Sequence, residues 1–275
     1  MALRAGRLRA GGDDGRIIAG VSGGPETTAG GAGPELAGRT VVVVSPHFDD
    51  VPLSLGQSLL TGALSQAAAV RVKVVFGRTN WSVRLYPTRR RAPLVTGWRR
   101  AEETLAARRF GYRFEVAPFE EVILRTGSTD AESYRGDHEA RDDALFLPVM
   151  QRLRQWRREG DELWVPAGLG RHLDHRIVAA AAAQVVGDGD GTGPVAFYED
   201  RPYASFLDDA ELVGQIGRLG LELEPVDVSG PIAPSTQEAV RRCYRSQIDG
   251  YFEAAQQRDL DEGRPERIWR PVPRP

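Results

Sequence analysis

Short runs of hydrophobic, often β-branched residues recur along the chain, and longer stretches with helical periodicity separate them. The first run, residues 40–44, is mostly valine and predicts a strand that is covered on both faces. Further strands are predicted at residues 70–76, 114–119, 162–166, 195–198 and 221–228. Helices are predicted at residues 53–64, 98–109, 143–156, 176–186 and 237–257.

Strands that alternate with helices indicate an α/β protein. We expect a single Rossmann-like domain over residues 37–270, with a mainly parallel sheet and helices on both of its faces. Residues 1–36 are rich in glycine and lack periodicity, which predicts a flexible N-terminal tail. Residues 271–275, PVPRP, are predicted to form an extended C-terminal end.

The composition narrows the class of protein. Of the 275 residues, 41% are hydrophobic and 27% are charged, and the formal net charge is -2, so no nucleic-acid partner is expected. No apolar run approaches the ~20 residues that span a membrane, and the first residues lack the apolar stretch of a signal peptide. The single cysteine, Cys243, is interpreted as structural and fits a reducing compartment. We therefore expect a cytoplasmic protein of undetermined oligomeric state.

Polar residues follow two of the predicted strands at the point where each strand ends. The segments SPHFDD (45–50) and GRHLDH (170–175) supply three of the four histidines and three acids, namely His47, Asp49, Asp50, His172, Asp174 and His175. The fourth histidine, His138, lies in a polar stretch and is predicted to be solvated. Functional groups in open α/β sheets gather beyond the carboxyl ends of the strands, so the two segments should meet in one crevice.

Histidines and acids in such a crevice suit a divalent metal. His47 and Asp50 are three residues apart, and one distant histidine would complete a set of three ligands that suits zinc and also ferrous iron. Asp49 then remains beside the metal as a general base, and the spare histidine could stabilise an oxyanion or protonate a leaving amine. The alternative is that each segment only caps a helix with its aspartates. The presence of both segments after strands favours the metal site.

The two segments together resemble the motifs of the LmbE-like, or PIG-L, deacetylases, which are zinc-dependent hydrolases of N-acylated amino sugars. The resemblance extends to TGWRRAEETLAARRFG (96–111), VAFYED (195–200) and RRCYRSQI (241–248), and it covers most of residues 38–250. It implies that His47, Asp50 and His175 bind the metal. It also implies that Asp49 is the general base and that His172 supports the tetrahedral intermediate.

The resemblance also implies roles for residues around the metal. Asp174 would orient a ligand histidine. Arg100 and Glu103 fall on the family's Arg-x-x-Glu, where they would form a supporting ion pair or contact the substrate.

Three positions depart from the family pattern. Phe48 and Val51 replace the Pro and Glu of the commoner PHPDDE motif. Gly170 stands where some sugar deacetylases have a tyrosine, so that an acid role would fall to His172 or to another tyrosine.

The segment 77–94 is too long for a simple connection and is predicted to be a lid beside the crevice. Trp81 and Tyr86 are candidates for stacking on a sugar ring. The run Arg89, Arg90 and Arg91 either meets an anionic group or forms a solvated face, and the solvated face is favoured.

These observations predict a metal-dependent N-deacetylase that acts on an amino sugar or a glycosylated specialised metabolite. The Gly- and Arg-rich composition is compatible with antibiotic biosynthesis in an actinobacterium. An amidase for a larger acyl or thiol conjugate, and a non-catalytic carbohydrate- or nucleotide-binding protein, remain as alternatives.

Overall fold

The computed structural model describes residues 34–127, 139–189 and 192–272. Its described strands form one sheet in the order β3-β2-β1-β4-β5-β7-β6, in which β1 to β5 pair in parallel and β6 and β7 pair antiparallel. The strands are β1 (Thr40–Ser45), β2 (Ala69–Val74), β3 (Arg113–Val116), β4 (Glu162–Pro166), β5 (Val195–Tyr198), β6 (Leu223–Pro231) and β7 (Pro265–Pro271). The α/β class and the mainly parallel sheet are thus as expected.

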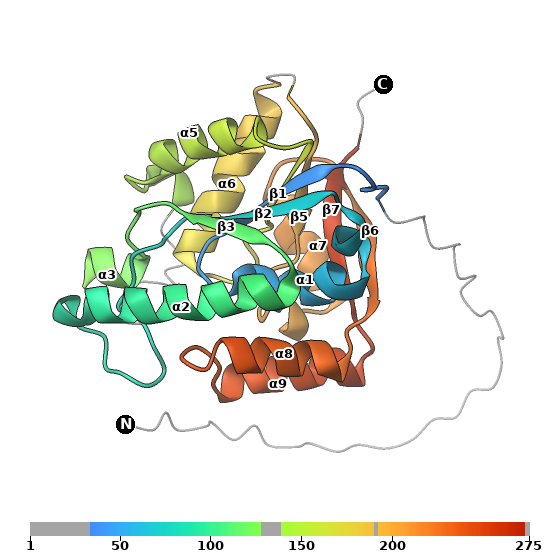
Figure 1. The fold of residues 1–275 in the computed structure, drawn as a ribbon. Coiled ribbons are helices and arrows are strands. Elements are labelled where there is room, and N and C mark those ends of the chain that lie inside the picture. The colour runs from blue at the N-terminus through green and yellow to red at the C-terminus, as the bar shows by residue number, and fades with distance from the viewer. Residues whose placement is uncertain (1–33, 128–138, 190–191, 273–275) are drawn as a thin grey trace, which may run out of the picture. The chain divides into compact units, whose positions relative to one another are not determined.

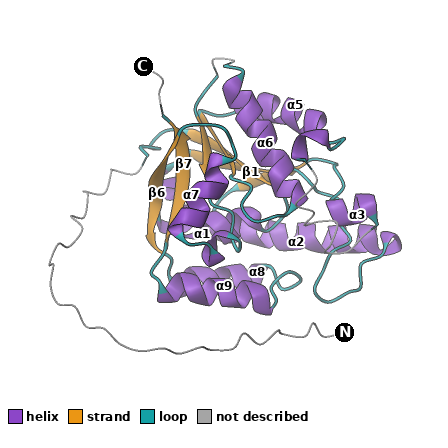
Figure 2. Ribbon diagram, turned by 180° about the vertical axis from the view of Figure 1, so that it is seen from behind, coloured by secondary structure: helices purple, strands orange, loops and turns teal. Residues whose placement is uncertain are grey.

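Helices cover both faces of the sheet (Figures 1 and 2). On one face lie α5 (Phe146–Arg157) and α6 (Leu173–Gly187), and on the other lie α1 (Asp50–Thr61), α2 (Ala92–Phe110) and α8 (Pro234–Cys243). The remaining helices are α3 (Val122–Thr126), α7 (Asp209–Gly217) and α9 (Gly250–Asp261), which runs beside α8.

The four consecutive valines of β1 are all buried, two on each face of the sheet. Val42 and Val44 pack into the core on the side of α5 and α6, whereas Val41 and Val43 pack into the core on the side of α1 and α2. Because successive side chains of a strand point to opposite faces, a strand that is covered on both sides needs a hydrophobic residue at every position.

The C-terminal region differs from the expectation in two ways. The single helix predicted at 237–257 is two helices, because residues 244–249 leave the helical path and Asp249 caps α9 by accepting hydrogen bonds from the N–H groups of Tyr251 and Phe252. Strand β7 was not predicted, because charged residues interrupt its hydrophobic pattern and one of them, Glu266, is buried.

The buried carboxylate of Glu266 binds backbone N–H groups that a break in α1 leaves without helical partners. Leu55 has φ -134° and ψ 18°, which are not helical values. The carboxylate of Glu266 accepts hydrogen bonds from the backbone N–H groups of Gln57 (2.8 Å) and Ser58 (2.6 Å), just after this break. It therefore acts on the second half of the helix as a capping residue does at a helix start.

The domain boundaries shift by a few residues. Of the predicted tail 1–36, residues 1–33 lie outside the described residues, but Leu36 is completely buried in the core beside α1. At the other end, Pro271 belongs to β7, and residues 273–275 lie outside the described part of the chain.

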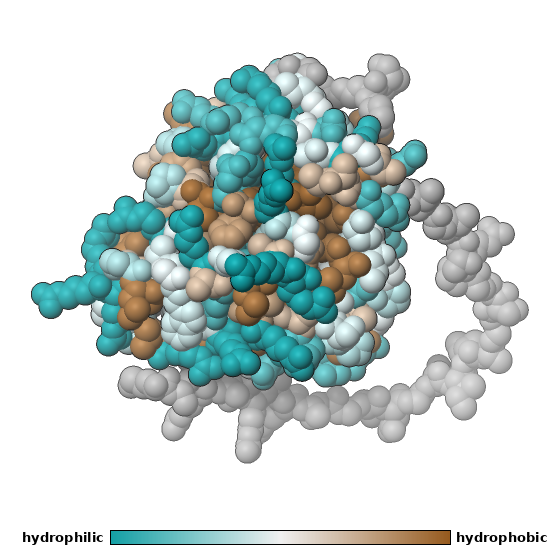
Figure 3. Space-filling view, in the orientation of Figure 1, coloured by the Kyte–Doolittle hydropathy of each residue, from teal (hydrophilic) through white to brown (hydrophobic). Residues whose placement is uncertain are grey.

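On the face shown in Figure 3, hydrophobic side chains gather in the region between α5 and α2, and hydrophilic side chains lie around this region. Within the described ranges, no helix combines the length and the hydrophobicity needed to cross a membrane.

Candidate metal centre and active site

The two polar segments meet at the carboxyl ends of β1 and β4, which are neighbours in the sheet. His47 lies two residues beyond β1, and His172 and His175 lie at the start of α6, beyond β4. One ring nitrogen from each of these histidines lies within 4.8 Å of the others, and all three side chains are buried. Such a cluster suggests a metal site.

Asp50 lies between two of these histidines. Its Oδ1 is 3.4 Å from Nε2 of His175, and its Oδ2 is 3.4 Å from Nδ1 of His47. Oδ2 also accepts a hydrogen bond of 2.6 Å from the backbone N–H of His47. Burial alone would raise the pKa of Asp50, but the charge of His175 and the hydrogen bonds from His47 outweigh it and lower this pKa. The predicted ligands His47, Asp50 and His175 therefore converge, and the donor set of imidazoles and a carboxylate fits zinc or ferrous iron.

A carboxylate contacts each of the two histidines that are predicted to be ligands. Nδ1 of His175 lies 2.6 Å from Oδ1 of Asp200, and the other oxygen of Asp200 accepts hydrogen bonds from the N–H groups of Gly168 and Leu169. This pairing leaves Nε2 of His175 to face Asp50. The sequence did not single out Asp200, although it follows β5 as His47 follows β1, and this shared strand-end position was a usable signal.

Asp174, which was predicted to orient a ligand histidine, lies 3.1 Å from Nε2 of His47. It also accepts hydrogen bonds from the backbone N–H of Val122 (2.9 Å) and from Nη1 of Arg125 (2.7 Å). Arg125 was not predicted. Burial raises the pKa of Asp174, but the hydrogen bond with His47 and the charge of Arg125 outweigh burial and lower this pKa. Arg125 therefore helps to keep the buried carboxyl ionised.

The side chain of Asp49 does not cap a helix. Asp49 occupies the N-cap position of α1, yet its side chain forms no capping hydrogen bond, and the same holds for His172 at the N-cap of α6. Instead, Nη2 of Arg99 donates a hydrogen bond of 2.5 Å to Oδ1 of Asp49. Burial raises the pKa of Asp49, and the charge of Arg99 opposes this rise. This geometry argues against the alternative in which the aspartates serve only as caps.

Arg100 does not support the site as expected, whereas its neighbour Arg99 contacts the site. Arg100 is exposed on the outer side of α2, whereas its neighbour Arg99 is buried and contacts Asp49. Adjacent residues of an α-helix are rotated by about 100° from each other, and here this rotation turns Arg100 to solvent. Arg99 lies on the buried side of α2, which also includes Val95, Glu102 and Glu103.

Glu103 is buried, but it pairs with tyrosines rather than with an arginine. It accepts hydrogen bonds from the hydroxyl groups of Tyr112 (2.9 Å) and Tyr244 (2.6 Å). Burial raises the pKa of Glu103 to about 8. The hydroxyl of Tyr244 is also 3.1 Å from the carbonyl oxygen of Phe48, so this group supports the turn that carries Asp49.

The cluster of histidines and aspartates opens into a cleft of about 250 Å³. Trp81 lines this cleft as expected of a substrate contact, but Tyr86 does not, and its side chain is 72% exposed because it points away from the domain. The segment 77–94 is tied to the connection between α8 and α9, since Val83 N–H donates to the carbonyl of Ser246 and Arg84 donates to that of Arg245.

Other predicted residues lie away from the cleft. The three arginines at 89–91 form a 3₁₀ turn with no buried side chain, and none of them lines the cleft, which agrees with a solvated face. Cys243 is buried in the core and is not a lining residue. His138 lies outside the described residues. Several lining residues were not foreseen, namely Val83, Arg99, Glu121, Ile123, Pro202, Tyr203, Gln247, Asp249, Tyr251 and Phe252.

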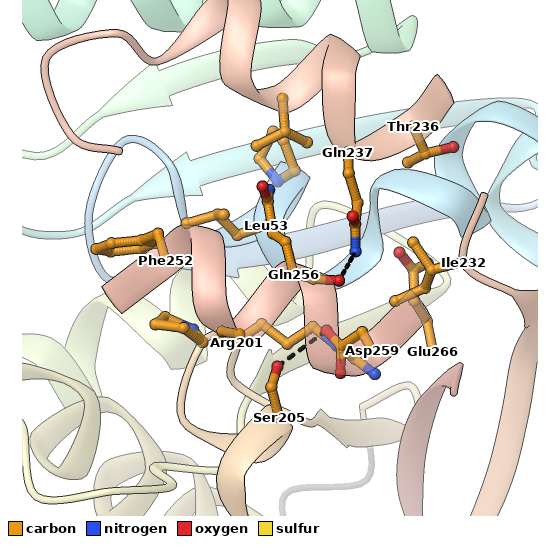
Figure 4. A pocket seen from close by; sticks show the side chains of 14 residues that line it. Leu53, Arg201, Ser205, Ile232, Thr236, Gln237, Phe252, Gln256, Asp259 and Glu266 are labelled. Atoms are coloured by element: carbon orange, nitrogen blue, oxygen red, sulfur yellow. Dashed lines mark hydrogen bonds and ion pairs between the residues drawn. The ribbon is translucent and has the colours of Figure 1, made fainter. Parts of the chain in front are cut away.

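A second, much smaller cavity of about 20 Å³ shares Pro202 and Phe252 with the cleft (Figure 4). Its lining includes the buried ion pair between Arg201 and Asp259, and Ser205 donates a hydrogen bond to the same carboxylate. The cavity therefore lies in a polar network that joins β5, α9 and β7.

The chain is similar to curated deacetylases. It is 33% identical over 213 residues to 2'-N-acetylparomamine deacetylase of Streptomyces fradiae, covering 75% of this chain and 72% of that protein. This chain belongs to the LmbE-like (PIG-L) deacetylase family. A second family member, 2'-N-acetylparomamine deacetylase of Niallia circulans, is 29% identical over 192 residues, which cover 60% of this chain and 68% of the relative. No protein-family model matches the chain.

Solved structures of other deacetylases share the fold. The zinc-inhibited form of teicoplanin deacetylase Orf2 aligns with a TM-score of 0.57 and 19% identity, covering 85% of this chain and 98% of that chain. The A40926 pseudoaglycone deacetylase Dbv21 aligns with a TM-score of 0.52 and 19% identity, covering 85% and 97%. At this level of identity, the likeness supports the fold of the family.

Proposed function

We propose that this protein is a metal-dependent N-deacetylase that removes the acetyl group from an amino sugar in the biosynthesis of a glycosylated antibiotic. The observation that carries this proposal is the convergence of three buried histidines, His47, His172 and His175, with two buried acids, Asp49 and Asp50, in one cleft. The curated relatives named for 2'-N-acetylparomamine support an aminoglycoside-type substrate. The single buried cysteine supports a reducing, cytoplasmic location.

The reaction breaks the amide C–N bond and joins a water oxygen to the acyl carbon, which yields acetate and an amine. Zn²⁺ or Fe²⁺ held by His47, Asp50 and His175 would polarise the amide carbonyl and make water a nucleophile near neutral pH. Asp49 accepts the proton of the water, and Arg99 holds its carboxylate in place. His172 donates a hydrogen bond to the oxyanion. The proton then passes to the leaving amine from Asp49 or His172.

Two buried polar atoms support a substrate with hydroxyl groups. Within the described part of the chain, Nε of Arg99 and Oε2 of Glu121 are buried and have no hydrogen-bond partner, and both residues line the cleft. Oε2 of Glu121 faces Nη1 of Arg99 at 3.9 Å, which is longer than a hydrogen bond, so a hydroxyl group that bridged the two side chains would be favoured here. Trp81, in the same lining, is placed to stack on a sugar ring.

The first test is metal content together with deacetylation of 2'-N-acetylparomamine. We expect about one equivalent of zinc or iron in the wild-type protein and its loss in the His47→Ala and His175→Ala variants. Asp49→Ala should keep the metal but lose activity, whereas the exposed Arg100→Ala serves as the control that keeps both. Full turnover by Asp49→Ala would contradict the role of the base. Release of an acid other than acetate would favour the amidase, and binding without turnover or metal would favour a binding protein.

A further inference from the structure

The strand order places two different walls on the two sides of the metal centre. β1 and β4, which carry the histidines, lie in the middle of the parallel part of the sheet, with β2 and β3 on one side and β5 on the other. Trp81 follows β2 and Glu121 follows β3, where Glu121 lies 3.9 Å from Arg99. The segment that follows β5 contributes Pro202 and Tyr203. The charged groups Arg99 and Glu121 thus lie on one side of the centre together with the aromatic ring of Trp81, and the other side presents a proline and a phenol ring.

This asymmetry orients an N-acylated sugar. Arg99 and Glu121 offer charged hydrogen-bonding groups, and Trp81 offers an aromatic ring, so the hydroxyl-bearing sugar ring is favoured on the side of β2 and β3. An amide whose carbonyl lies at the metal centre then directs its acyl group towards the side of β5. The acyl group is apolar and suits a wall of Pro202 and Tyr203.

Tyr203 is a rigid part of this wall. Its ring centroid is 5.5 Å from that of His175, and the two rings are nearly perpendicular, at 89°. Behind Tyr203 lies Gly170, where an added Cβ atom would come within 2.8 Å of the tyrosine ring. The backbone N–H of Gly170 donates to the side chain of Gln215, which holds the glycine in place. The phenol ring therefore packs directly against the backbone of Gly170, at a position where any larger residue would displace it.

Two cavities adjoin this wall. Gly170 and Gln215 line a cavity of about 630 Å³ that Tyr203 does not line, so removal of the phenol ring would bring the cleft closer to that space. The cavity that shares Pro202 and Phe252 with the cleft has a volume of only about 20 Å³. That volume corresponds to one or two water molecules. The ion pair between Arg201 and Asp259 lines this cavity (Figure 4), so an acyl chain that entered it would desolvate charged groups.

We propose that Tyr203 determines the length of the acyl group, by closing the cleft on the β5 side so that acetyl amides are accepted and longer acyl amides are rejected. The proposal rests on the proposed function, because it concerns the acyl half of the same substrate. It assigns Tyr203 a direct contact with the acyl group rather than a part in proton transfer.

The test compares N-acetyl-, N-butanoyl- and N-hexanoylglucosamine as substrates of the wild-type protein and of Tyr203→Ala, Tyr203→Leu and Tyr203→Phe. For Tyr203→Ala, we expect the ratio of kcat/KM for hexanoyl to that for acetyl to rise at least about tenfold, because one methylene in a pocket changes specificity by about 10- to 200-fold. Tyr203→Leu should give a smaller rise, and Tyr203→Phe should keep the wild-type ratio. Tyr86→Ala, at an exposed tyrosine that does not line the cleft, is the matched control and should leave the ratio unchanged.

Binding of the product acids provides a readout that does not need turnover. Calorimetry with acetate, butanoate and hexanoate should show weaker binding of the longer acids to the wild-type protein and a relative gain for hexanoate in Tyr203→Ala. Equal changes for all chain lengths, in kinetics or in binding, would overturn the role of Tyr203. If no amide is hydrolysed but the binding preference still shifts with Tyr203, the proposed function fails and the acyl wall stands.

Discussion

Nη2 of Arg99 lies 2.5 Å from Oδ1 of Asp49, and both side chains are buried at the edge of the metal centre. Arg99 comes from α2 and Asp49 from the turn after β1, so the contact joins two segments that are 50 residues apart. It gives the proposed base a defined orientation and a compensating charge. Without this charge, a carboxylate buried in the cleft would be costly.

Replacement of Arg99 by methionine should therefore impair catalysis more than metal binding. Without the charge of Arg99, burial would raise the pKa of Asp49 further and leave less carboxylate to act as the base, so kcat/KM should fall at least about 100-fold. The metal content should stay near that of the wild-type protein, because Arg99 contacts no predicted ligand. Arg100→Met, at the exposed neighbouring position, is the matched control. Equal losses in the two variants would show that the contact with Asp49 has no catalytic role.

Asp200 should control the affinity for the metal through His175. The Asp200→Asn variant keeps an oxygen for the backbone N–H groups of Gly168 and Leu169 but loses the charge next to Nδ1 of His175. Loss of such supporting carboxylates usually costs about 10- to 100-fold in metal affinity, and we expect a loss in this range when a chelator competes for the ion. Asp208→Asn, at the N-cap of α7, should leave metal affinity unchanged. An unaltered affinity in Asp200→Asn would refute the role.

Leu36 should contribute to the stability of the domain, although its sequence context is that of a Gly-rich tail. Its side chain is completely buried, so Leu36→Ala should lower the free energy of unfolding by about 2–5 kcal/mol. Leu94→Ala, at a side chain that is 65% exposed, should change it by no more than about 0.5 kcal/mol. Urea unfolding of the two variants measures both changes in the free energy of unfolding. If Leu36→Ala had as small an effect as Leu94→Ala, Leu36 would not be part of the folded domain.

Glu266 should make stability depend on pH. Burial raises its pKa from 4.5 to about 7, although the charge of Arg201 and the N–H groups of α1 oppose the rise. Between these two values the folded state binds more protons than the unfolded state, so the contribution of Glu266 to stability is present at low pH and is lost as the pH rises towards 7. The total loss is about 3 kcal/mol.

The Glu266→Gln variant isolates this effect. Because glutamine does not titrate, the difference in unfolding free energy between variant and wild type should shift in favour of the variant as the pH rises from 4.5 to 7, and then level off. Urea unfolding at several pH values measures this difference. A difference that does not change with pH would mean that Glu266 is not a proton-linked group.

Hydrophobic patterns were sufficient to locate the buried strands. The predicted bounds 162–166 and 195–198 coincide with β4 and β5, because strands covered on both faces are hydrophobic at nearly every position. Strand β7 was missed because its buried Glu266 is stabilised by backbone groups of α1, and this partner is more than 200 residues away in the sequence. Local periodicity cannot reveal such a contact.

The sequence by itself determined the kind of chemistry. Histidines and aspartates directly after two parallel hydrophobic strands lie at the carboxyl edge of the sheet, and that placement predicts a metal site from the sequence alone. Tertiary structure decided which neighbours complete the site. It selected Arg99 over Arg100, brought Asp200 to His175 and placed Tyr203 over Gly170. These choices depend on helix rotation and on the order of strands in the sheet, which are set by packing between distant segments rather than by local sequence.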